Sequence, residues 1–145
     1  MIYQNISSGW AKEPLSVKSL GDNMAEEEDI LKKMGERLRR QEELYGFQPF
    51  LTDFLSQYPD LFMAYTELSG RLLVEPKHLG PKEVELASIS AGAALGSDHC
   101  LNVHIAQALK AGATKEEIVE AMMIGGLMAM TRSLSASFRK LAELE

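Results

Sequence analysis

Helical periodicity is the sequence feature that most constrains this fold. From Ala25 onward, apolar residues recur every three or four positions, and glycine or proline separates one such stretch from the next. This pattern predicts helices that begin near Ala25, Pro49, Pro59, Pro81, Ser97 and Thr114. No stretch alternates apolar and polar residues as a strand does. We therefore expect an all-α bundle of about six helices, with short connections that favour antiparallel neighbours.

The first part of the chain lacks this periodicity. Residues 1–24 contain glycine, proline and several serines without a sustained pattern. We predict an irregular N-terminal arm over residues 1–24 and one domain over residues 25–145. The arm is either a loosely ordered tail or a segment that packs on a neighbouring subunit through Trp10, the single tryptophan.

Charge and composition exclude several classes of function. The 145 residues include 15 Lys and Arg against 21 Asp and Glu, a net charge of −6 without a basic block, so we expect no nucleic-acid partner. The longest uncharged apolar runs, Ala87–Gly96 and Ala121–Met130, are too short to span a membrane. The first residues do not resemble a signal peptide, and the single cysteine rules out an intrachain disulfide. These features predict a cytoplasmic protein.

One segment, from Glu85 to His104, carries side chains suited to catalysis. Cys100 lies in the first turn of the helix expected to begin near Ser97, where backbone amides and the helix dipole favour a thiolate. His104 follows four residues later on the same face, so it can accept the thiol proton. Glu85, on the preceding helix, can orient His104 or relay a proton, with the Ser97 hydroxyl between them.

Each of these residues also has a structural interpretation. A lone cysteine is often a small buried hydrophobe, Ser97 is an ordinary N-cap residue, and His99 can simply face solvent. A metal site built on His99, Cys100 and His104 is a further alternative. However, adjacent residues on a helix point about 100° apart, so such a site would need a helix terminus or a second subunit.

The helix expected after Thr114 has two further features. Thr114 and Glu117 form a capping box, and the pair Gly125-Gly126 predicts a close approach of another helix. The same stretch carries methionines expected in the core or at a subunit interface, namely Met122, Met123, Met128 and Met130.

The segment from Glu85 to His104 resembles the carboxymuconolactone decarboxylase superfamily, and more closely its alkylhydroperoxidase D-like branch. That branch carries a glutamate, a Cys-x-x-Cys motif, and a histidine four residues after the second cysteine. Glu85, Cys100 and His104 match these positions, and His99 matches a histidine also found in the branch. The first cysteine is replaced by Ser97 in this sequence.

The resemblance covers roughly residues 45–135 and includes the stretch ALKAGATKEEIVEAMMIGGLMAM. It implies the alkylhydroperoxidase D fold and a homotrimer or homohexamer. It also implies a thiol-dependent peroxidase, an antioxidant oxidoreductase without a cofactor. Cys100 would attack a hydroperoxide, with His104 and Glu85 as proton relay and with Ser97 and His99 beside them. Because Ser97 cannot form the usual disulfide, an external thiol, a thiol protein or Cys100 of another subunit would have to reduce the sulfenic acid.

Two alternatives remain open. The decarboxylases of the superfamily act on a carboxylated lactone without a cofactor, and His99 and His104 can in principle serve as acid and base. The sequence places no Arg or Lys cluster near the motif to hold such a metabolite, since the nearest candidates, Lys110 and Arg132, are remote. The other alternative is a non-catalytic oligomeric member that kept the fold and lost the second cysteine.

Overall fold

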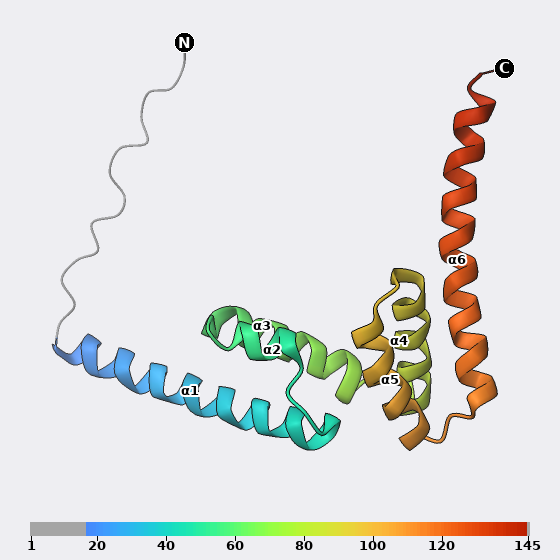
Figure 1. Ribbon diagram of the computed structural model, residues 1–145. Coiled ribbons are helices and arrows are strands. Elements are labelled where there is room, and N and C mark those ends of the chain that lie inside the picture. The colour runs from blue at the N-terminus through green and yellow to red at the C-terminus, as the bar shows by residue number, and fades with distance from the viewer. Residues whose placement is uncertain (1–16, 145) are drawn as a thin grey trace, which may run out of the picture.

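The computed structural model describes residues 17–144, which form helices joined by short connections (Figure 1). The elements are α1 (Val17–Tyr45), α2 (Phe50–Leu55), α3 (Pro59–Ser69), the π-helical turn η1 (Gly70–Val74), α4 (Pro81–Leu95), α5 (Asp98–Lys110) and α6 (Lys115–Ala142). These described residues contain no strand, so the prediction of an all-α fold with about six helices is confirmed. None of the described helices is both long and apolar enough to cross a bilayer.

Helix α4 is the centre of the C-terminal half of the molecule, because it packs against both α5 and α6 (Figure 1). The core between these helices is built from Ile89 of α4, Ala108 of α5, Ala113 of the following turn, and Ile118 and Ala121 of α6. Ile89 and Ala108 are completely buried. This packing holds α4 and α5, which carry the motif, in a defined relation to each other.

The N-terminal half is held together by α1 and α3. Met34 of α1 and Phe62 of α3 are buried. The guanidinium of Arg37 on α1 donates a hydrogen bond of 2.7 Å to the hydroxyl of Thr66 on α3. A buried hydroxyl needs such a partner, so this contact favours the observed placement of α1 across α3.

Glycine residues end α1 and α4, and a capping box begins α6, at the positions that the sequence predicts. Gly46 after α1 and Gly96 after α4 have positive φ values of 82° and 65°, which glycine adopts without strain. The capping box at the start of α6 is present. The Thr114 hydroxyl accepts from the Glu117 amide at 3.1 Å, and the Glu117 carboxylate accepts from the Thr114 amide at 2.8 Å.

The start of α1 differs from the expectation. The helix begins at Val17 and not near Ala25, so the last part of the predicted irregular arm is helical. The rest of that arm, with Trp10, lies outside the described residues. The expected division into an arm and a domain stays a prediction.

Helix α6 touches the rest of the chain only along its first half within the described structure. Gly125 is buried against α4, as the close approach predicted for the Gly125-Gly126 pair requires. Met122 packs on the core. The other three methionines of this stretch, Met123, Met128 and Met130, are exposed. From residue 131 to residue 144 every side chain is exposed, and Figure 1 shows this part of α6 extending beyond α4.

The two adjacent glycines of α6 give a matched test of this packing. A Cβ at Gly125 would collide with the carbonyl oxygen of Ser90, which is backbone and cannot swing aside, whereas a Cβ at Gly126 meets open space. We expect Gly125→Ala to lower the free energy of unfolding by about 1–3 kcal/mol. Gly126→Ala is expected to raise it by up to about 1 kcal/mol through helix propensity. Urea denaturation followed by circular dichroism measures both, and equal shifts of the same sign would contradict the packing.

Candidate functional site

The site is built on a direct contact between α4 and α5. The Nδ1 atom of His104 lies 2.7 Å from the Oε2 atom of Glu85. Both side chains are largely shielded, with exposed fractions of 14% for His104 and 13% for Glu85. The turn at Gly96 brings α5 back against α4, and this places a residue of the first half of α4 beside the middle of α5.

The contact gives His104 a defined chemical role. A carboxylate only accepts hydrogen bonds, so Nδ1 of the imidazole carries the hydrogen and Nε2 carries the lone pair. Within the described residues Nε2 makes no hydrogen bond. Nε2 is therefore able to take a proton from a neighbouring acid, while Glu85 holds the ring in place and stabilises the imidazolium that forms.

Tyr45 at the end of α1 lies within range of the charge of Glu85. The pKa of Tyr45 is raised above its ordinary value, first because burial disfavours the phenolate, then because of the negative charge of Glu85, and last because of Tyr65. The end of α1 is held against α5 by a hydrogen bond of 3.0 Å from Gln107 Nε2 to the Leu44 carbonyl. Tyr45 could not be predicted as part of this region, because nothing in the local sequence pattern indicates that the end of α1 lies near α5.

Cys100 lies in the first turn of α5 and is exposed, so the interpretation of this residue as a buried hydrophobe is wrong. Its backbone amide faces the Ser97 hydroxyl at 3.5 Å, a long distance for a hydrogen bond. A Cβ placed on Gly92 of α4 would lie 3.5 Å from the Cβ of Cys100. The same Cβ would lie 3.3 Å from Cδ2 of Leu101, so the glycine allows α5 to approach α4 closely at this point.

Ser97 and His99 have contacts of their own near the start of α5. Ser97 is the N-cap of α5, and Glu85 contacts His104 directly, without Ser97 between them. The exposed ring of His99 packs edge-on against Phe47, with the ring centroids 6.1 Å apart. In the described part of the chain no three His, Cys, Asp or Glu side chains gather closely enough to hold a metal ion, so the alternative metal site is not assembled there.

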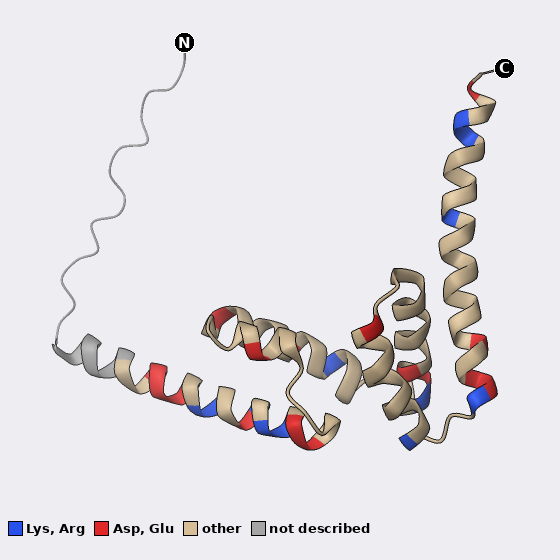
Figure 2. Cartoon of the chain, in the orientation of Figure 1, with Lys and Arg blue, Asp and Glu red and all other residues tan. Residues whose placement is uncertain are grey.

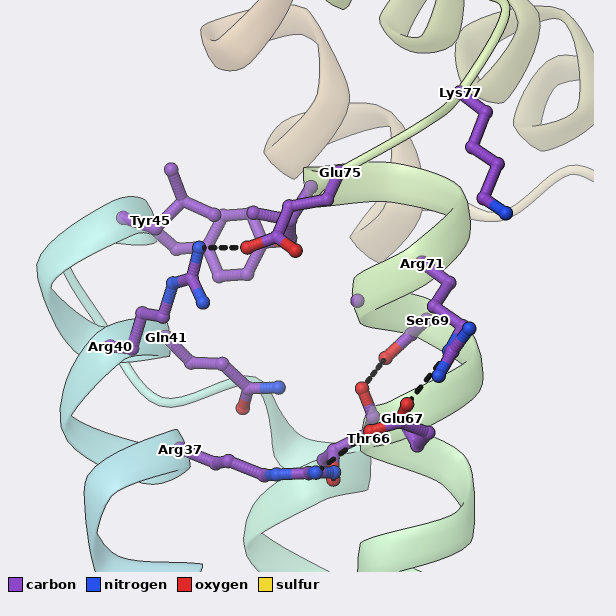
Figure 3. A pocket seen from close by; sticks show the side chains of 13 residues that line it. Arg37, Arg40, Gln41, Tyr45, Thr66, Glu67, Ser69, Arg71, Glu75 and Lys77 are labelled. Atoms are coloured by element: carbon purple, nitrogen blue, oxygen red, sulfur yellow. Dashed lines mark hydrogen bonds and ion pairs between the residues drawn. The ribbon is translucent and has the colours of Figure 1, made fainter. Parts of the chain in front are cut away.

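A pocket of about 410 Å³ lies beside the site, between α1 and the α3–η1 segment (Figure 3). Tyr45 lines this pocket, together with four cationic side chains, namely Arg37, Arg40, Arg71 and Lys77. The four cations belong to three separate segments of the sequence, and only the packing of α1 against α3 and η1 brings them together.

Comparison with known proteins identifies the family. The model of the "Carboxymuconolactone decarboxylase family" matches residues 59–143, more than half of the chain. The chain belongs to the carboxymuconolactone decarboxylase family. The match covers Glu85, Cys100 and His104 and leaves α1 and α2 outside. Membership of the alkylhydroperoxidase D-like branch stays a prediction. No curated protein and no solved structure matches the chain significantly.

The proximity of Tyr45 to Glu85 is testable by titration. We expect Glu85→Gln to lower the pKa of Tyr45 towards its ordinary value, because the substitution removes the second cause of the shift. The pKa stays above that value because burial, the largest cause, remains. NMR titration with ¹³C-labelled tyrosine reports this pKa. Glu83→Gln on the same helix is the control and leaves the pKa unchanged; an unchanged pKa in Glu85→Gln would contradict the proximity.

Proposed function

We propose that this member of the carboxymuconolactone decarboxylase family is a thiol-dependent peroxidase. The observation that supports the proposal most is an exposed Cys100 one helical turn before His104, whose Nδ1 is held by Glu85. Residues four apart on a helix have Cβ atoms about 5–6 Å apart, within reach of proton transfer between the two side chains. The first turn of α5 also offers the backbone amides and dipole that favour a thiolate.

The proposed reaction is a two-electron oxidation of Cys100. His104 Nε2 takes the thiol proton, and the thiolate attacks one oxygen of a hydroperoxide ROOH. A sulfur–oxygen bond forms, the oxygen–oxygen bond breaks, and the alkoxide leaves as ROH with the proton returned by His104. Cys100 becomes a sulfenic acid, and Glu85 stabilises the imidazolium between the two proton transfers.

The second half of the cycle needs an external reductant. With Ser97 in place of a second cysteine, the sulfenic acid has no partner in its own subunit. An external thiol or a thiol protein attacks the sulfur, water leaves, and a second thiol releases Cys100 as the free thiol with formation of a disulfide. The exposure of Cys100 suits this role, because the reductant must reach the sulfur atom.

We further propose that the chain assembles as a homo-oligomer, a trimer or a hexamer, through one face of α6. The α6 face is an exposed apolar stripe with spacings of three or four residues, formed by Leu127, Met130, Leu134, Phe138 and Leu141. Figure 2 shows few charged residues along this part of the helix. A helix with such a stripe gains its stability from packing, and a second copy presents the same surface in return.

A second candidate function is acid–base catalysis on a small carboxylated metabolite. The Glu85–His104 pair favours it, because the pair is complete without Cys100 and can transfer protons by itself. The two functions differ in their dependence on the thiol. Acid–base activity survives Cys100→Ser and is lost in His104→Ala, whereas peroxidase activity is lost in Cys100→Ser.

Reaction of the protein with stoichiometric cumene hydroperoxide and a sulfenic-acid trap tests the first proposal. We expect one trapped adduct by intact mass, none in Cys100→Ser, and labelling slowed by roughly 10²-fold or more in His104→Ala, since a positioned base contributes at least that much. His78→Ala is the control, because His78 is an exposed loop residue and we expect wild-type labelling. No adduct in the wild type would overturn the peroxidase proposal, and equal labelling in His104→Ala would exclude His104 as the base.

The molar mass in solution tests the assembly. We expect Phe138→Glu, in the middle of the α6 face, to shift sedimentation from the oligomer towards the monomer, because a buried unpaired carboxylate is costly. Ala136→Glu places the same charge on the opposite side of α6 and is expected to leave the mass unchanged. A monomeric wild type, or a Phe138→Glu variant with the wild-type mass, would show that the α6 face is not the interface.

A further inference from the structure

The pocket between α1 and the α3–η1 segment is separate from the Glu85–His104 pair and Cys100, since none of these residues lines it (Figure 3). Its walls come from α1, through Arg40, Gln41 and Leu44, and from η1 and the following loop, through Val74 and Lys77. Neither the cysteine nor any histidine lines it. At about 410 Å³ the pocket is within the size range of small-molecule sites.

Two of the cations lining the pocket are engaged with a carboxylate. Arg37 and Arg71 both contact Glu67, at 2.9 Å and 2.7 Å. These hydrogen bonds, first from Arg71 and then from Arg37, hold the pKa of Glu67 below its ordinary value, so Glu67 stays ionised at neutral pH. Figure 3 shows Arg37 reaching from α1 towards α3, and Arg71 beside Glu67 on the other side of the view; the three side chains contribute one net positive charge.

The other two cations are available to a ligand. Arg40 contacts Glu75 at 2.8 Å, but both side chains are mostly exposed, at 63% and 69%. Such exposed pairs contribute little to stability, so a ligand can draw Arg40 away at little cost. Lys77 forms no ion pair within the described part of the chain. In total the pocket has four cations and two carboxylates, an excess of two positive charges on a chain of net charge −6.

The Gln41 side chain indicates where a polar group of the ligand would bind. Figure 3 shows its amide extending from α1 into the space before α3 and η1. Its Oε1 atom is buried and has no hydrogen-bond partner among the described residues. Oε1 only accepts hydrogen bonds, so it needs a donor such as a hydroxyl group of the ligand, whereas the Nε2 of the same amide can donate to an anionic group. The remaining wall is apolar and aromatic, formed by Leu44, Val74 and the ring of Tyr45.

We propose that this pocket binds a small amphipathic organic anion. The positive charges of Arg40 and Lys77, on opposite sides of the pocket, attract the anionic group, which accepts a hydrogen bond from Gln41 Nε2, and a short apolar body lies along Leu44 and Val74. Arg40 and Gln41 belong to α1, which lies outside residues 59–143 that match the family, so this site goes beyond what family membership describes. The proposal does not rest on peroxidase activity, since neither Cys100 nor His104 takes part.

Calorimetric titration of the full chain with three probes tests the ligand class. Hexanoate carries both a charge and an apolar body, hexanamide carries the body alone, and inorganic phosphate carries the charge alone. We expect hexanoate to bind at least about three-fold more tightly than either of the other two. Equal affinity for hexanamide would show that charge is not recognised, and equal affinity for phosphate would show that the apolar wall is not used; either result overturns the proposal.

Two charge substitutions with opposite expected effects on hexanoate affinity test the location of the site. Lys77→Gln should weaken hexanoate binding by about three- to ten-fold, and Glu75→Gln, which releases Arg40, should strengthen it by about two- to five-fold. Arg132→Gln on α6 removes the same charge far from the pocket and should leave the affinity within about two-fold of the wild type. Circular dichroism melting establishes that each variant is folded. If Lys77→Gln and Arg132→Gln have the same effect, the anion does not bind in this pocket. Because no turnover is measured, this outcome is independent of the peroxidase test.

Discussion

The contact between Glu85 and His104 joins the stability of this protein to its chemistry. It lies between α4 and α5, largely shielded from solvent, in an interior otherwise formed by apolar side chains. A shielded carboxylate without a partner is costly, so the pair favours one arrangement of the two helices as well as one tautomer of the imidazole. The same packing places Gly92 beside Cys100, and the close approach at Gly125 fixes α6 on the other side of α4.

Much of this arrangement could be predicted from the sequence, because the signals are local. The period of the apolar residues defines the helices. Their limits are marked by glycines at the ends of α1 and α4 and by the capping box at Thr114. The spacing of the motif on two consecutive helices also predicted that Glu85 can orient His104. The early start of α1 could not be predicted, since the segment VKSLGDNM contains glycine, aspartate and asparagine, which favour helices weakly.

The features that the sequence did not reveal depend on contacts between distant segments. Tyr45 comes near Glu85 because the end of α1 is tied to α5 through Gln107. The cations of the pocket come together because Arg37 reaches across to Thr66 and Glu67. Periodicity tells which face of a helix is buried, but not which other helix covers it. For the same reason, the packing of His99 against Phe47 was not visible in the spacing of the motif.

Tyr45 links the two parts of the molecule, because it lines the pocket and also responds to the charge of Glu85. An anion bound in this pocket, as we propose, would add negative charge near Tyr45 with the same sign as that of Glu85, and both charges would disfavour the phenolate. A neutral Tyr45 keeps its hydroxyl hydrogen and remains a hydrogen-bond donor. Because Tyr45 lies outside the family-matched segment, this electrostatic coupling means that the surroundings of Glu85 include a residue of α1.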